Sequence, residues 1–189
     1  AVAYVASVEE VVLGVFIDRV AAAVGGFHGE TADWIRDFPR LLSITEYRVF
    51  DEFSEYAARQ SGGEPVAFRA GVPDDGLFQL LLSLYHFLKA PFDVAKALRS
   101  ALSVGGEVTT LCALVGGLGG AFLGESALPR RLIEEVGAAS QAVELADGLA
   151  AALNASRGDA GDEGDASGGE ISDSESDGAS DADAGSGAQ

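Results

Sequence analysis

Residues 76–124 read GLFQLLLSLYHFLKAPFDVAKALRSALSVGGEVTTLCALVGGLGGAFLG, and this stretch decides the fold class. Its apolar residues recur every three or four positions, which is the spacing of one face of a helix. The pattern predicts three helices, over Gly76–Lys89, Phe92–Val104 and Val108–Leu123. Ala90-Pro91 separates the first two, and Gly105-Gly106 separates the last two, because proline and paired glycines interrupt helices.

The same periodicity continues on both sides of this stretch. It predicts further helices over Val2–Val24, Thr31–Phe38, Thr45–Gln60 and, as a pair, Arg130 to about Asn154. We expect Thr31 to cap the second of these, and Asp74-Asp75 to cap the helix that begins at Gly76. Because strand-like alternation never persists, the sequence predicts an all-α protein.

The charge balance limits the function classes. The chain has 189 residues, with 12 Lys and Arg against 30 Asp and Glu, a formal net charge of −18. Binding to nucleic acid or to anionic lipid is excluded as a main function, because both need clustered cations. Only Lys89 and Lys96 are lysines. An acidic, lysine-poor surface is typical of halophilic proteins, although an ordinary acidic bacterial protein is the alternative.

The composition changes near Asn154. Residues 155–189 are almost wholly Gly, Ala, Ser, Asp and Glu, with ten acidic residues against Arg157. Such a segment buries too little apolar surface to fold, so we expect a disordered, solvating acidic tail. A cation-binding or partner-binding arm is the other interpretation. The predicted organisation is a helical domain over residues 1–154 and a tail over 155–189.

The single cysteine and the two histidines are too few for a cysteine-based or histidine-rich metal site, and the sequence indicates a cytoplasmic protein. Cys112 is the single cysteine, which excludes an internal disulfide and a zinc site built from cysteines. We interpret Cys112 and His86 as core residues and His28 as a loop residue. Trp34 is interpreted as packing, with stacking on an adenine as the alternative. The uncharged run 111–124 is too short to span a membrane, and no signal peptide is evident.

The segment Gly105-Gly106-Glu107-Val108-Thr109-Thr110 is the most unusual part of the sequence. A double glycine permits a sharp turn into a helix, and oxygen-bearing side chains with free amides then stand at the helix start. That combination suits an anion or a hard metal ion. The alternative is an ordinary cap, with Thr as the capping residue and Glu in the first turn.

In its context this segment resembles the C-terminal end of the ADP-ribosylglycohydrolase family. The family pattern is an apolar helix, a Gly-Gly-Asp-x-Asp-Thr metal motif, a Gly/Ala-rich helix and Ile-Pro, and Ala127-Leu128-Pro129 stands at the last position. The clear match covers about Leu77 to Val136. The resemblance implies an all-α orthogonal multi-helix bundle, of which this chain would hold the C-terminal half.

The resemblance also implies a binuclear Mg²⁺ or Mn²⁺ site that positions ADP-ribose for hydrolysis of its glycosidic bond. The motif's first Asp falls on Glu107, its second Asp on Thr109 and its Thr on Thr110. These three are the implied metal ligands, and Gly105 and Gly106 the implied substrate-binding residues. Thr109 replaces a charged ligand by a hydroxyl, and the family's Thr-Asp-Asp-Thr motif is not found in this chain.

Two hypotheses follow from these departures. The chain is a divergent or truncated hydrolase of ADP-ribosyl bonds that uses a divalent metal, or it is an inactive helical module that binds ADP-ribose or other proteins. No catalytic residue is assigned, and the metal is lost if the motif has eroded. Expected partners are ADP-ribose or an ADP-ribosylated protein, with a homo-oligomer or a partner chain supplying the missing half.

Overall fold

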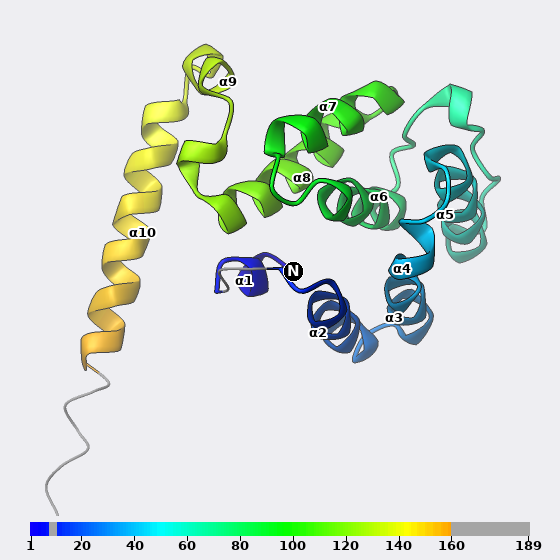
Figure 1. Cartoon of the computed structure of the whole chain (residues 1–189), viewed down its shortest axis with the longest axis horizontal. Coiled ribbons are helices and arrows are strands. Elements are labelled where there is room, and N and C mark those ends of the chain that lie inside the picture. The colour runs from blue at the N-terminus through cyan, green and yellow to red at the C-terminus, as the bar shows by residue number, and fades with distance from the viewer. Residues whose placement is uncertain (8–10, 160–189) are drawn as a thin grey trace, which may run out of the picture. The chain divides into compact units, whose positions relative to one another are not determined.

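The computed structural model describes residues 1–7 and 11–159, with side chains through residue 155. These residues form helices and connecting turns, and their only β-type pairing is an isolated bridge between Val72 and Gly106. The all-α prediction is confirmed. The chain divides into two compact units, residues 1–137 and residues 138–189. The described residues of the first unit form nine α-helices, which Figure 1 labels.

The helices are, in chain order, α1 (Val2–Val5), α2 (Leu13–Gly25), α3 (Gly29–Arg36), α4 (Phe38–Leu41), α5 (Glu46–Ser61), α6 (Gly76–Lys89), α7 (Val94–Val104), α8 (Val108–Leu123), α9 (Arg130–Glu135) and α10 (Ala139–Asp159), with 3-10 turns at Phe68–Ala70 and Glu125–Ala127. The bounds predicted for α6 and α8 are correct to the residue. The single helix predicted over Val2–Val24 is instead α1 and α2, and residues 8–10 between them lie outside the described residues.

The centre of the first unit is the packing of α8 against α6 and α7, and α1 also contacts α8. The two helices α7 and α8 approach closely where Gly119 faces Val94. A Cβ built on Gly119 would stand 2.7 Å from Cγ2 of Val94, so only glycine fits there without movement. The largest fully buried side chains of the core are mostly aromatic: Tyr56, Tyr85, Phe16, Phe38, Phe50, Phe53, Phe78 and Phe87.

Two caps can be compared with the prediction. Asp75 caps α6, where its Oδ1 accepts a hydrogen bond from Phe78 N–H at 2.8 Å, as expected from the sequence. Thr31 does not cap α3. The cap is His28, whose Nδ1 accepts from Thr31 N–H at 3.2 Å. The Thr31 hydroxyl is buried and lies 2.8 Å from both His28 Nδ1 and the Tyr56 hydroxyl. The helix therefore begins at Gly29, two residues earlier than predicted.

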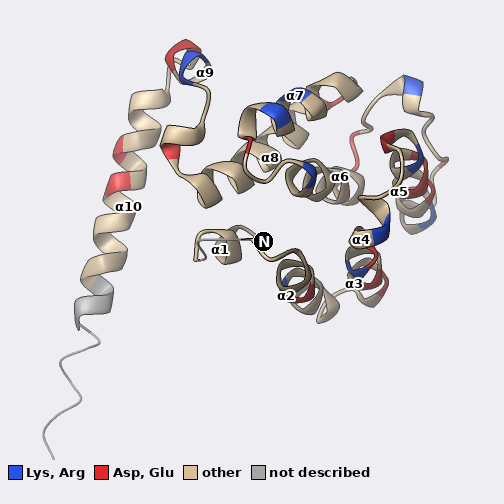
Figure 2. Cartoon of the chain, viewed as in Figure 1, with Lys and Arg blue, Asp and Glu red and all other residues tan. Residues whose placement is uncertain are grey.

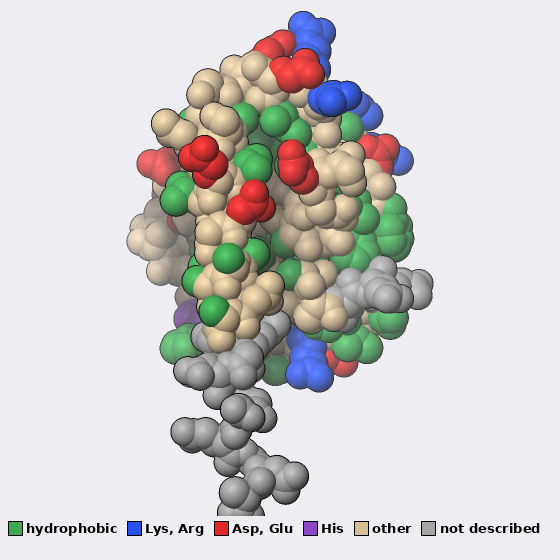
Figure 3. Space-filling model, turned by 90° about the vertical axis from the view of Figure 1, so that its left-hand side faces the viewer, with side chains coloured by type: hydrophobic (Ala, Val, Ile, Leu, Met, Phe, Trp, Pro, Cys, Tyr) green, Lys and Arg blue, Asp and Glu red, His purple; other side chains and the backbone are tan. Residues whose placement is uncertain are grey.

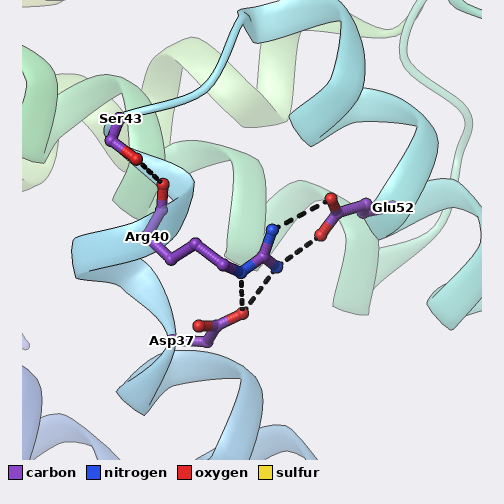
Figure 4. A network of polar contacts seen from close by, with 4 residues as sticks. All are labelled: Asp37, Arg40, Ser43 and Glu52. Atoms are coloured by element: carbon purple, nitrogen blue, oxygen red, sulfur yellow. Dashed lines mark hydrogen bonds and ion pairs between the residues drawn. The ribbon is translucent and has the colours of Figure 1, made fainter.

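Charged side chains are distributed unevenly over the first unit. They are frequent on α3, α4 and α5, whereas α8 carries none (Figure 2). The best-formed ion-pair network joins α4 to α5 (Figure 4). The Arg40 guanidinium donates to both Glu52 carboxylate oxygens, at 3.1 and 2.6 Å, and to Asp37 at 2.7 Å. These groups are partly exposed, so the network stabilises the fold only modestly.

The second unit is described through α10. This helix continues to Asp159, so residues 155–159 of the predicted tail are helical, and residues 160–189 lie outside the described residues. Leu145 and Leu149 on α10 are exposed, and hydrophobic side chains (green) are visible at the protein surface in Figure 3. Within the described residues, none of the helices combines the length and the apolar content that crossing a bilayer requires.

Candidate functional site

The candidate site is the start of α8, and two backbone hydrogen bonds fix its position. Val72 N–H donates to the Gly105 carbonyl oxygen at 2.9 Å, and Glu107 N–H donates to the Val72 carbonyl oxygen at 2.9 Å. Val72 itself is buried. The loop that enters α8 is therefore held against a segment more than thirty residues earlier in the chain.

Glycines make this contact possible. Gly71, Gly105 and Gly106 all have positive φ, at 80°, 76° and 76°, a region that other L residues rarely adopt. A Cβ on Gly106 would stand 2.4 Å from the Val72 nitrogen, and a Cβ on Gly71 would stand 2.5 Å from the Gly106 nitrogen. The backbones touch directly, with no room for a side chain between them. Gly105 and Gly106 thus have a structural reason for being glycine.

The three side chains implied as ligands stand together at the beginning of α8. Glu107 occupies the capping position, and Thr109 and Thr110 lie in the first turn. All three residues are exposed. No side chain makes a capping hydrogen bond to α8, so the interpretation of Thr as its cap is wrong. The first amides of the helix are left for solvent or a ligand.

This donor set does not make a complete Mg²⁺ site. A hexacoordinate ion needs several hard oxygen ligands, usually with more than one carboxylate, and Glu107 is the one carboxylate among Glu107, Thr109 and Thr110. Across residues 1–7 and 11–159, no three His, Cys, Asp or Glu side chains gather as a metal-binding group. The residues at the start of α8 can supply one side of such a site, and further acidic ligands would have to come from elsewhere.

Trp34 lies in a different setting from the one that adenine binding would require. Its ring packs on Tyr56, with centroids 5.1 Å apart, and on the edge of Phe53. The groove beside it has a volume of about 290 Å³ and is otherwise lined by three carboxylates, those of Glu30, Asp33 and Asp37. Like-charge repulsion disfavours an anionic nucleotide there. The interpretation of Trp34 as a packing residue therefore agrees with its contacts.

The remaining candidates of the sequence have structural roles. His86 is 1% exposed in the core, as predicted. Cys112 is half-buried and free, and burial raises the pKa of its thiol, so it is a poor nucleophile at neutral pH. His28 lies in the connection between α2 and α3, as predicted, and its side chain also caps α3.

Sequence reasoning missed the Gly71-Val72 segment, although it positions the candidate site. The segment lies in a connection between α5 and α6 that carries no helical pattern, and its partner is distant in the sequence. The signal available was the glycine itself, which stands directly before the buried Val72 and Pro73. A lone glycine in a connection does not identify which segment approaches it.

Comparison with known proteins identifies a family that the chain matches. A family model described as ADP-ribosylglycohydrolase matches residues 1–159, which is most of the chain and includes every described helix. No curated protein and no solved structure matches the chain.

Proposed function

We propose that this chain, which belongs to the ADP-ribosylglycohydrolase family, acts on ADP-ribosylated substrates through the loop that begins α8. The observation that carries the proposal is the rigid Gly105-Gly106 turn. It presents the Glu107 carboxylate, two hydroxyls and the free amides of a sixteen-residue helix on one exposed surface. Helix amides and the helix dipole favour a bound diphosphate. We infer that hydrolysis of the glycosidic bond needs a divalent metal, Mg²⁺ or Mn²⁺, with its other acidic ligands supplied from outside the described residues.

A second candidate function is binding without hydrolysis. The single carboxylate at the metal motif favours it, because one charge holds a divalent ion weakly. In that case the chain would be a helical module that recognises ADP-ribose or a protein partner. The acidic, lysine-poor composition and the single cysteine support a halophilic, cytoplasmic setting for either function.

Calorimetry on the whole chain in high KCl tests the proposal. Heat on addition of ADP-ribose, larger with Mg²⁺ than without it, is expected if the α8 loop binds the diphosphate. Release of ADP-ribose from a modified protein then separates the hydrolase from the binding module. A folded chain that gives no heat under either condition would refute binding of ADP-ribose, both as a hydrolase and as a binding module, and would leave a protein partner as the ligand to test.

A restored variant tests the metal proposal directly. The double substitution Glu107→Asp and Thr109→Asp adds a charge at the motif, so we expect Mg²⁺ to bind roughly tenfold tighter. The matched control is Ser126→Asp, which adds a carboxylate beyond the other end of α8. Equal Mg²⁺ affinity in the restored and control variants would contradict a metal site at this loop.

A further inference from the structure

His86 is a titratable side chain in the core that the candidate site does not use. It lies on α6 and is 1% exposed. Its Nδ1 is 3.0 Å from the Ser100 hydroxyl of α7. Its Nε2 is buried and has no hydrogen-bond partner among the described residues. The imidazole thus joins α6 to α7 through one nitrogen only.

The neighbours of the imidazole favour one of its two neutral tautomers. The Ser100 hydroxyl also lies 3.4 Å from Glu46 Oε2 on α5. A hydroxyl that donates to this carboxylate accepts from Nδ1–H of His86, which favours the tautomer with no proton on Nε2. Lys89 lies close by, with its Nζ 3.8 Å from Glu46 and 2.7 Å from the Tyr85 hydroxyl. The Glu46 carboxylate is therefore shared between Ser100 and Lys89.

Within the described residues, the other helices packed on α6 place no acidic group in direct contact with the imidazole, so a charged imidazole would have no partner there. Cys112 is the one titratable side chain of α8. The remaining cations of α7, Lys96 and Arg99, are exposed. Glu46 is the one acidic group in the hydrogen-bonded network around His86, and it does not touch the imidazole directly.

We propose that His86 is an acid-sensitive latch, in which neutral His86 holds α7 against α6 and α5, and protonation of Nε2 releases α7. A proton on Nε2 would place a charged imidazole in the core with no acceptor for the new N–H, beside the ammonium of Lys89. Solvent is the available acceptor, and reaching it requires α6 and α7 to separate. Burial, and to a lesser extent Lys89, lower the pKa of His86 to about 4, consistent with a proton that enters only when the contact opens.

Release of α7 would also affect the candidate site, because α7 leads directly into the loop before α8. Ser100 lies one turn before Val104, the last residue of α7, and Gly105 follows directly. Gly105 accepts the bond from Val72 that holds the loop. Movement of α7 therefore loosens the loop that presents Glu107. The latch does not depend on the proposed function, whereas its effect on ligand binding would.

Nuclear magnetic resonance and hydrogen exchange test the latch without an activity assay. The substitution His28→Asn keeps a capping side chain for α3 and leaves His86 as the only histidine, so its titration is read without overlap. We expect His86 to stay neutral to about pH 5. With a pKa of about 4 closed and 6.5 open, corrected exchange of the α7 and Glu107 amides should rise roughly twentyfold from pH 6 to pH 4.5.

The variant His86→Phe supplies the comparison, because it fills the same space and cannot take a proton. Its exchange rates should be nearly independent of pH over this range. The proposal is overturned if His86 titrates at pH 6 or above, or if the α7 amides of His86→Phe respond to acid as strongly as those of the His28→Asn protein. If His86→Phe does not fold, exchange in the His28→Asn protein decides the matter, because α7 amides whose corrected exchange does not rise from pH 6 to pH 4.5 overturn the proposal.

Discussion

Adding one methyl group at the contact between Gly71 and Gly106 should greatly lower the free energy of unfolding. In Gly106→Ala the new Cβ would stand 2.4 Å from the Val72 nitrogen and 2.6 Å from its carbonyl oxygen. The two backbones must separate by about 1 Å to reach ordinary contact distance, which breaks or weakens both bonds to Val72 at a cost of about 1 kcal/mol each. Positive φ adds about 1–2 kcal/mol of strain. We expect a total loss of roughly 3–4 kcal/mol in the free energy of unfolding.

Gly62→Ala is the matched control for this substitution. Gly62 also has a positive φ, of 71°, but a Cβ there would meet nothing within 4 Å, so its cost should be the strain alone, about 1–2 kcal/mol. Urea denaturation, followed by circular dichroism, measures both losses. The reasoning would be refuted if Gly106→Ala destabilised the protein no more than Gly62→Ala does.

A double-substitution cycle sharpens the same test. Gly71→Ala should destabilise the protein for the same reason, since its Cβ would stand 2.5 Å from the Gly106 nitrogen. Once one substitution has separated the backbones, the other meets less resistance. The combined loss for Gly71→Ala with Gly106→Ala should therefore fall short of the sum of the single losses by 1 kcal/mol or more. Strict additivity would mean that the two glycines do not act through one contact.

Three smaller effects follow from other parts of the structure. Because burial lowers the pKa of His86 to about 4 from an unfolded value of 6.5, the unfolded chain binds the proton more tightly, and stability present above pH 6.5 is lost as the pH falls toward 4. The histidine contribution to that loss is about 2 kcal/mol between pH 7.5 and pH 5, and urea titrations should show it in the wild type and not in His86→Phe. Asp75→Ala removes the cap of α6 and should lower the free energy of unfolding by about 1 kcal/mol; no loss would mean that the cap is replaced by solvent. Arg40→Ala should cost less than about 1 kcal/mol, and the cost should shrink as KCl is raised, which thermal melts at two salt concentrations would show.

The sequence predicted the regular parts of the fold well, because local signals specify them. The bounds of α6 and α8 follow from Asp75, Gly105-Gly106 and Gly124, each of which acts on its own neighbourhood. The start of α3 was misplaced because Thr31 has a buried partner, Tyr56, twenty-five residues away. A propensity argument does not include such a partner.

The residues of the candidate site stay a prediction, and the way in which the loop is held was not predicted. Motif resemblance singled out Gly105, Gly106 and Glu107, and the family match supports the resemblance that led to them. The pairing of Gly106 with Val72 depends on a long-range approach of two backbones. No periodicity or spacing in the sequence specifies it, and it emerged only from the three-dimensional structure.

The uneven placement of charge means that ionic strength acts on one part of the first unit more than on another. Residues 29–61, from α3 to α5, contain seven acidic residues and four arginines, whereas residues 76–123, from α6 to α8, contain two acidic and three basic residues. Dilution of salt therefore raises self-repulsion within the first segment and leaves the second almost unaffected. On transfer to dilute buffer, α3 to α5 should unfold first, while the uncharged α8 keeps its packing on α6 and α7.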